Sequence, residues 1–145
     1  MRRTKAGKIL LTIAVGAFAV INLLADWNKT HVFNPTWPPH ARFHAADMSV
    51  IVWSVSVIAI WLLWRRSTEP EVGIMVAPLV SLALWSPFLY VTLIVPGTSL
   101  YVGGAPPALQ HKIAGMMIEP QVVLAILFLL LTALGYGLAR RAGAR

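Results

Sequence analysis

Side chains that can bind a metal or transfer a proton gather in two segments of this 145-residue chain, 26–47 and 96–119. These segments contain all four histidines and three of the five carboxylates. The seven side chains are Asp26, His31, His40, His44, Asp47, His111 and Glu119. Imidazole titrates near neutral pH and acts as a metal ligand or as a general acid and base, and carboxylates can take the same roles. The composition of the two segments therefore predicts a shared site.

His40, His44 and Asp47 have the spacing of one helix face. Proline suits the first helical position, so the Pro38-Pro39 pair predicts a helix that begins near Pro39. On that helix the three side chains stand at i, i+4 and i+7, which places them on one side. Two imidazoles and a carboxylate suit zinc or non-haem iron, the candidate cofactors. The alternative is an interfacial pair of histidines that contacts water or lipid headgroups.

Further polar residues complete this candidate cluster. Asn22 and Asp26 form an i, i+4 pair at the end of an apolar run. Glu119 precedes Pro120, where a carboxylate also favours the positive end of a helix. The candidate binding or proton-transfer residues are Asn22, Asp26, His31, Asn34, Arg42, His111 and Glu119. Arg42 adds a cation that could hold an anionic group.

Four uncharged apolar runs separate these segments, at 9–25, 48–64, 73–95 and 120–139. A helix needs about 20 residues to cross roughly 30 Å of hydrocarbon, and the runs have this order of length. The chain is 58% hydrophobic and 12% charged, outside the range of soluble domains. We therefore predict an all-α fold, a four-transmembrane-helix bundle with two irregular outer loops, in one domain spanning 1–145. Pro78 and Pro87 predict a kink in the third span.

The basic residues predict the orientation of the bundle. Nine of the 12 Lys and Arg residues precede the first span or follow the second and fourth. Lys and Arg accumulate on the cytoplasmic side of short loops. Both termini are therefore expected in the cytoplasm, with the histidine-bearing segments outside. The richness in Ala, Arg and Gly is typical of a bacterial source and hence of the inner membrane.

Other readings of the sequence are less favoured. The basic stretch 1–8 before the first run resembles the start of a signal peptide, but the apolar run is longer than a usual signal core. The net charge of +7 does not form the basic face of a nucleic-acid-binding module, so no nucleic acid is expected. With no cysteine, the chain has neither disulfides nor thiolate ligands.

The segment 26–44, with Asp26-Trp27 and the run from His31 to His44, resembles a family of small four-helix membrane proteins of unknown function. The matching pattern is close to DWNxTHxFNPxWPPHARFH. The helix count also resembles the emopamil-binding and sigma-2-receptor type of sterol-handling membrane proteins. Those proteins carry acidic groups in a membrane cavity, whereas the span centres of this chain lack carboxylates.

Two functions remain open from the sequence. In the first, the chain binds a lipid-soluble small molecule or joins a larger membrane complex or oligomer, and the outer polar cluster holds the loops onto the bundle. In the second, it is a membrane enzyme or metal-dependent redox module, with His40, His44 and Asp47 as the primary ligand set. We favour the first.

Overall fold

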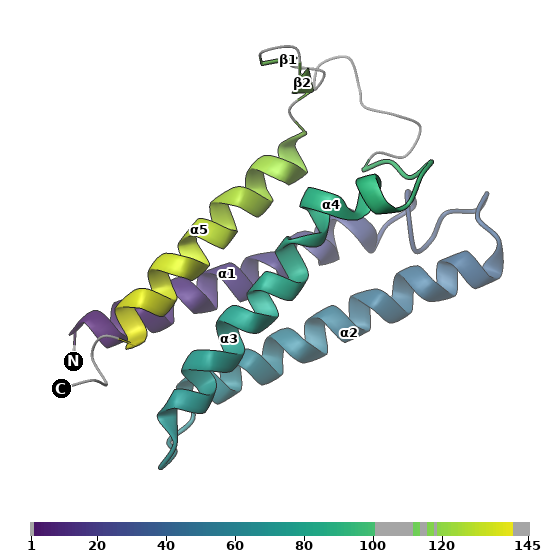
Figure 1. Cartoon of the computed structure of the whole chain (residues 1–145). Coiled ribbons are helices and arrows are strands. Elements are labelled where there is room, and N and C mark those ends of the chain that lie inside the picture. Colours follow the sequence, from purple (N-terminus) through teal and green to yellow (C-terminus); the bar gives the residue numbers. More distant parts are fainter. Residues whose placement is uncertain (1, 101–111, 114–115, 118, 141–145) are drawn as a thin grey trace.

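The computed structural model describes residues 2–100, 112–113, 116–117 and 119–140, and these residues form five helices (Figure 1). The helices are α1 (Arg2–Asp26), α2 (Pro39–Trp64), α3 (Pro70–Trp85), α4 (Pro87–Ile94) and α5 (Pro120–Arg140). Two-residue strands, β1 (Lys112–Ile113) and β2 (Met116–Met117), pair in antiparallel fashion before α5. The all-helical class predicted from the apolar runs is thus confirmed in its main part.

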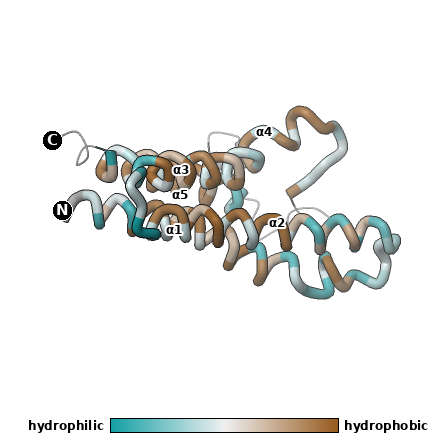
Figure 2. Tube along the Cα trace, turned by 90° about the horizontal axis from the view of Figure 1, so that it is seen from below, coloured by the Kyte–Doolittle hydropathy of each residue, from teal (hydrophilic) through white to brown (hydrophobic). Residues whose placement is uncertain are grey.

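Three helices, α1, α2 and α5, are long and apolar enough to cross a membrane. The pair α3 and α4 passes the same test together but is bent by 42° at its break, so it adds a fourth candidate span. The start of α1, the α2–α3 turn and the end of α5 lie at one end of the bundle, and the α1–α2 loop lies at the other (Figure 1). Hydrophobic residues fill the length between these ends (Figure 2).

The two prolines of the third run act differently. Pro78 lies inside α3, and the helix continues past it to Trp85. Pro87 instead occupies the first turn of α4, directly after Ser86, and marks the 42° bend. Proline suits a first helical turn because the amide hydrogen it lacks has no helical partner there. The predicted kink is therefore present, at Pro87.

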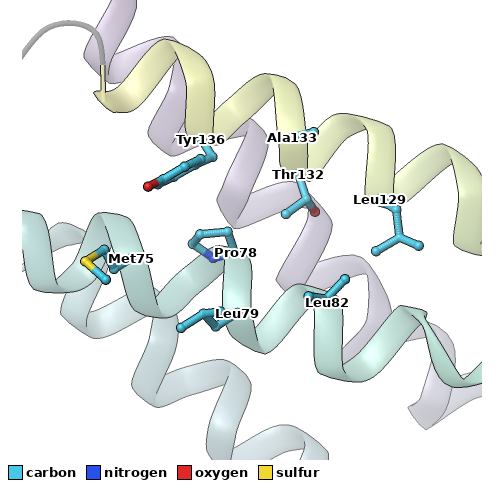
Figure 3. Close-up of a pocket in the computed structure, with 8 residues that line it drawn as sticks. All are labelled: Met75, Pro78, Leu79, Leu82, Leu129, Thr132, Ala133 and Tyr136. Atoms are coloured by element: carbon cyan, nitrogen blue, oxygen red, sulfur yellow. The ribbon is translucent and has the colours of Figure 1, made fainter.

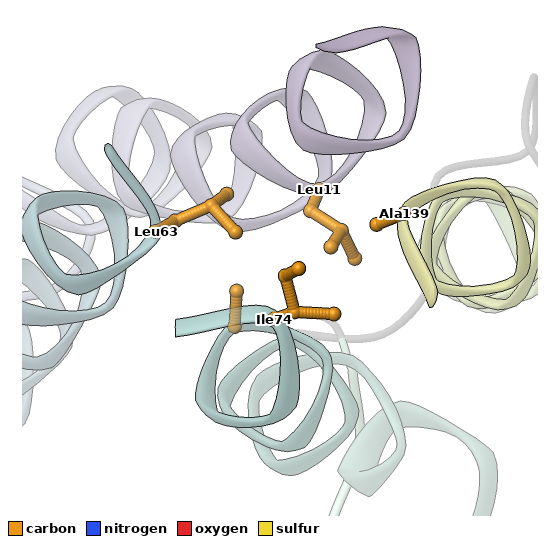
Figure 4. Packing of buried hydrophobic residues seen from close by; sticks show 5 residues of the cluster. Leu11, Leu63, Ile74 and Ala139 are labelled. Atoms are coloured by element: carbon orange, nitrogen blue, oxygen red, sulfur yellow. The ribbon is translucent and has the colours of Figure 1, made fainter. Parts of the chain in front are cut away.

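The helices pack against one another through buried faces that contain small and polar side chains. The buried face of α2 consists of Ser49, Val52, Ser56, Ala59 and Leu63. Small residues let membrane helices approach closely, because lipid offers no hydrophobic drive to bring helices together. A compact apolar cluster joins Leu11, Leu63, Ile74, Ala77 and Ala139, with side chains from α1, α2, α3 and α5 meeting at one centre (Figure 4).

Polar contacts fasten α1 to α2 at the end that contains the α2–α3 turn. The Lys8 ammonium donates to the Leu63 carbonyl at 2.7 Å, an acceptor that the end of α2 leaves free. The same ammonium lies 5.8 Å from the centre of the Trp64 ring. Trp64 Nε1 in turn donates to Thr12 Oγ1 at 2.8 Å. These contacts fix the register of the two helices.

Glycine allows α1 and α5 to touch through their backbones. A Cβ added at Gly7 would lie 2.5 Å from both the Ala139 nitrogen and the Gly135 oxygen. Such distances require the helices to separate, since backbone atoms cannot rotate away. In contrast, a Cβ at Gly137, on the same helix as Gly135, meets nothing within 4 Å.

Gly7→Ala should therefore lower the free energy of unfolding by about 1–3 kcal/mol, the usual cost of overpacking a tight interface. Thermal unfolding of the purified protein in detergent measures this effect. Gly137→Ala is the matched control and should leave stability unchanged or slightly raised, because alanine favours the helix. Equal stability of both variants would contradict the close packing of α1 on α5.

Candidate functional site

The polar residues at the end of α1 form a connected chain. Asn22 Nδ2 donates to Asp26 Oδ2 at 2.5 Å, one helical turn away. Asp26 Oδ1 faces His31 Nε2 at 3.7 Å, and both side chains are about one third exposed, 34% and 32%. The Asn22–Asp26 pair predicted from the spacing is confirmed, and His31 joins it through the loop.

The two ring nitrogens of His31 face different partners. Its Nδ1 lies 2.8 Å from Thr30 Oγ1, which itself donates to Asn28 Oδ1 at 2.6 Å. Because the Thr30 hydroxyl has one proton, giving it to Asn28 leaves His31 Nδ1 to act as the donor. The other ring nitrogen, Nε2, is then the one that faces the Asp26 carboxylate.

Two Asn-x-Thr turns give the loop its shape. Asn28 Oδ1 accepts from the amide of Thr30 at 2.7 Å, and Asn34 Oδ1 accepts from the amide of Thr36 at 3.0 Å. Asn28 Nδ2 also donates to the last carbonyls of α1, and Asn34 Nδ2 donates to the Thr30 carbonyl at 3.0 Å. Such side chains replace the backbone ladder in turns. The loop between α1 and α2 is therefore held in a defined shape by its own side chains.

His40 and His44 lie on one face of α2, as predicted, with their Nε2 atoms 3.0 Å apart. The helix begins at Pro39, also as predicted. Both imidazoles are exposed, and His40 stacks on Phe43 at a centroid distance of 6.4 Å. They form a pair at the surface, separate from the Asp26–His31 contact.

The remaining candidates do not assemble into one centre. Asp47 and Arg42 are exposed on α2, and Glu119 is half-buried before α5. His111 lies outside the described residues. Among the side chains that the structure describes, no group of three or more His, Asp and Glu residues could hold a metal ion. The structure thus brings His40 and His44 together, but the predicted metal set of His40, His44 and Asp47 gains no support from the described residues.

An apolar pocket of about 260 Å³ lies beside the polar chain, between α1 and α2. Its walls are Ala19, Val20, Leu23, Trp53 and Val57. Val57 is 67% exposed, so the pocket opens away from the bundle. Above it, Trp27 packs against both Trp53, at a ring distance of 5.1 Å, and Phe33, at 5.7 Å. Phe33, Trp27 and Trp53 thus form an aromatic wall, a row of ring contacts that runs from the loop to the pocket.

Three buried side-chain atoms of α1 and α2 have no hydrogen-bond partner within the described residues: Asn22 Oδ1, Trp53 Nε1 and Ser56 Oγ. Asn22 is 7% exposed and directly precedes Leu23 of the pocket wall. A buried polar atom without a partner is costly, so such atoms often mark a site for water or a ligand. Sequence reasoning missed Trp53, although an indole within a span is a signal that its N–H needs an acceptor.

A larger apolar groove of about 380 Å³ lies between α3 and α5 (Figure 3). Its lining residues are Met75, Pro78, Leu79, Leu82, Leu129, Thr132, Ala133 and Tyr136. This groove could not be predicted from the sequence, because apolar side chains at helical spacing are equally typical of a packed interface. It shares no residue with the pocket between α1 and α2.

Asn34 is the buried residue on which the loop geometry depends. Asn34→Ala removes three side-chain hydrogen bonds, to the Thr30 carbonyl and from the Thr36 amide and hydroxyl. We expect faster hydrogen exchange of the 28–37 amides and a loss of about 1–3 kcal/mol in local stability. Mass-spectrometric exchange on the detergent-solubilised protein measures it. Lys29→Ala, at an exposed position of the same loop, is the control, and equal exchange in both variants would contradict this role.

Comparison with known proteins places this sequence in a family. Residues 10–144, nearly the whole chain, match a profile described as a family of unknown function (DUF6640). No curated protein and no solved structure matches the chain. The expectation of an uncharacterised family is met, while the likeness to sterol-handling proteins stays a resemblance. The chain belongs to the DUF6640 family of unknown function.

Proposed function

We propose that this chain is a four-span protein of a bacterial inner membrane, with both termini cytoplasmic, that binds a lipid-soluble small molecule where α1 and α2 meet the outer loop. The observation that carries this proposal is the adjacency of two features. The connected polar chain of Asn22, Asp26 and His31 stands at the end of α1, and the apolar pocket walled by Leu23 and Trp53 lies beside it.

This arrangement fits an amphipathic ligand. Binding sites for small molecules are largely apolar, with a few placed polar groups that fix orientation. Here the pocket between α1 and α2 supplies the apolar part and is open toward the bilayer at Val57. Asp26 and His31 supply polar groups at the depth where an amphiphile keeps its head.

The unpartnered atoms indicate the chemistry of the head. Asn22 Oδ1 is an acceptor that needs a donor, and Trp53 Nε1 is a donor that needs an acceptor. A hydroxyl can both donate and accept a hydrogen bond, so a long-chain or ring alcohol has the chemistry that either group needs. The aromatic wall of Trp27 and Trp53 offers flat surface for a ring or chain below that hydroxyl.

The metal-dependent enzyme has less support. The two imidazoles of His40 and His44 approach each other, but within the described residues they lack a third ligand. Metal sites in proteins usually take three or more protein ligands. Association with a membrane partner or a second copy is compatible with the proposed binding site and needs no separate residue set.

Cysteine labelling tests the proposed topology. A cysteine at Thr36, in the exposed outer loop, should react with a membrane-impermeant maleimide in intact cells. A cysteine at the exposed Thr68, in the α2–α3 turn, should react only after lysis. The chain has no native cysteine, so the background is clean. Reversed labelling would overturn the orientation and the outer placement of the site.

Photolabelling tests the binding site. A long-chain alcohol with a diazirine in its chain should form adducts on the α2 peptide that contains Trp53 and Val57. Val57→Trp fills the pocket and should abolish these adducts, because position 57 lines it. Ile58→Trp is the matched control, because the neighbouring residue is also exposed but lies outside the pocket wall. Labelling that both variants lose, or both keep, counts against the site.

The polar head contact is tested by Asn22→Leu. Losing one hydrogen bond should weaken labelling about fivefold, since a net hydrogen bond is worth about 1 kcal/mol. The corresponding long-chain methyl ether, which cannot donate, should label the unchanged protein as weakly as the alcohol labels Asn22→Leu. Equal labelling by alcohol and ether would show that the pocket binds the hydrocarbon chain without a hydrogen bond from the hydroxyl. Thermal unfolding of each variant confirms that it is folded.

A further inference from the structure

The groove between α3 and α5 is the larger of the two hollows and is open along its length. Leu79 on its α3 side is 60% exposed, and Met75 and Leu82 are also exposed. In Figure 3 the labelled side chains of α3 and α5 face one another across the space, with Tyr136 at one end and Leu129 and Leu82 at the other. The groove therefore has the shape of a trough along the helices.

The polar atoms in the floor of this groove are already satisfied. Thr132 Oγ1 donates to the Phe128 carbonyl at 2.7 Å. Ser81 Oγ lies 2.6 Å from Thr132 Oγ1. Since the Thr132 proton goes to Phe128, the Ser81 hydroxyl is the donor to Thr132. Neither hydroxyl has a proton left to donate to a ligand. The floor thus favours a hydrocarbon chain over a ligand that forms hydrogen bonds along its length.

At one end of the groove, the apolar lining is followed by a charged residue within a single turn of α5. Tyr136 closes the trough, and the Arg140 guanidinium lies 5.9 Å from the centre of its ring. This end carries the start of α1 and the α2–α3 turn as well (Figure 1). Glu69 and Glu71 lie exposed near this end, but within the described residues the one ion pair under 4 Å joins Asp26 and His31. Arg140 is therefore not neutralised by either carboxylate.

We infer that this groove binds an anionic glycerophospholipid of the inner leaflet, with one acyl chain along α3 and α5 and its phosphate at Arg140. The apolar trough matches the chain, and the guanidinium complements the phosphate charge. Basic side chains at the cytoplasmic interface attract anionic lipids. Tyr136, with its ring between the chain and the headgroup, has the usual place of an interfacial aromatic residue.

This inference uses the proposed membrane orientation and is independent of the pocket between α1 and α2. The two sites lie between different pairs of helices and share no lining residue. Arg140 also has a purely structural alternative, since a cation in the last turn stabilises a helix through its dipole. The experiment must therefore read lipid choice and not stability alone.

Native mass spectrometry of the full chain, released from nanodiscs of equal phosphatidylglycerol and phosphatidylcholine, measures which lipid stays bound. We expect the unchanged protein to retain phosphatidylglycerol in excess. Arg140→Gln should reduce that excess about fivefold, the equivalent of about 1 kcal/mol. Ala133→Phe should reduce retention of both lipids, because a phenyl ring at this exposed lining position fills the trough.

Arg65→Gln is the matched control. Arg65 stacks on Trp61 at 5.2 Å at the same end of the bundle but does not line the groove. It should leave the lipid ratio unchanged. An unchanged ratio in Arg140→Gln, an equal fall in Arg65→Gln, or a protein that retains neither lipid and appears as a dimer would each overturn the inference. Photolabelling of the outer pocket by the diazirine alcohol reports on the other site, so either proposal can fail alone.

Discussion

The close backbone contact between α1 and α5 at Gly7 and Gly135 is the constraint on which the rest of the bundle depends. Helices in hydrocarbon gain little from burying apolar surface, so van der Waals contact between small residues must hold them together. Because α1 and α5 meet without side chains between them, Leu11 and Ala139 reach the same cluster. The position of α1 then determines where Asn22 and Asp26 emerge at its far end.

A second set of contacts joins α3 to both α1 and α5. Trp85 Nε1 donates to the Ala14 carbonyl at 2.9 Å, and the Trp85 ring stacks on Phe128 of α5 at 4.4 Å. A buried indole with a satisfied N–H locks three helices at once. With α1 held between α2 and α5, both hollows follow from the geometry. One lies between α1 and α2, beside Ala19 and Trp53, and the other between α3 and α5, beside Leu79 and Ala133.

The sequence predicted the elements better than the site. Charge-free runs and the Pro38-Pro39 pair located α2 and the shared face of His40 and His44, because these depend on local geometry and helical period. The break in the third run came at Pro87, while Pro78 was tolerated inside α3. A proline kink depends on which neighbouring helices can replace a lost hydrogen bond, and this is a tertiary property.

The candidate residues form two separate groups, the Asp26–His31 contact and the His40–His44 pair. The position of His31 depends on side chains of the loop and not on helical spacing. Asn28 and Asn34 turn the loop back so that His31 faces Asp26, whereas His40 and His44 remain at the surface of α2. A count of histidines cannot separate these two outcomes. The buried polar residues around the loop are more informative than the histidines. Asn22 and Asn34 are buried, and a buried polar atom needs a hydrogen-bond partner. Asn34 finds its partners within the loop, whereas Asn22 Oδ1 has no hydrogen-bond partner among the residues that the structure describes. A ligand that donates a hydrogen bond to Asn22 would therefore satisfy a buried acceptor.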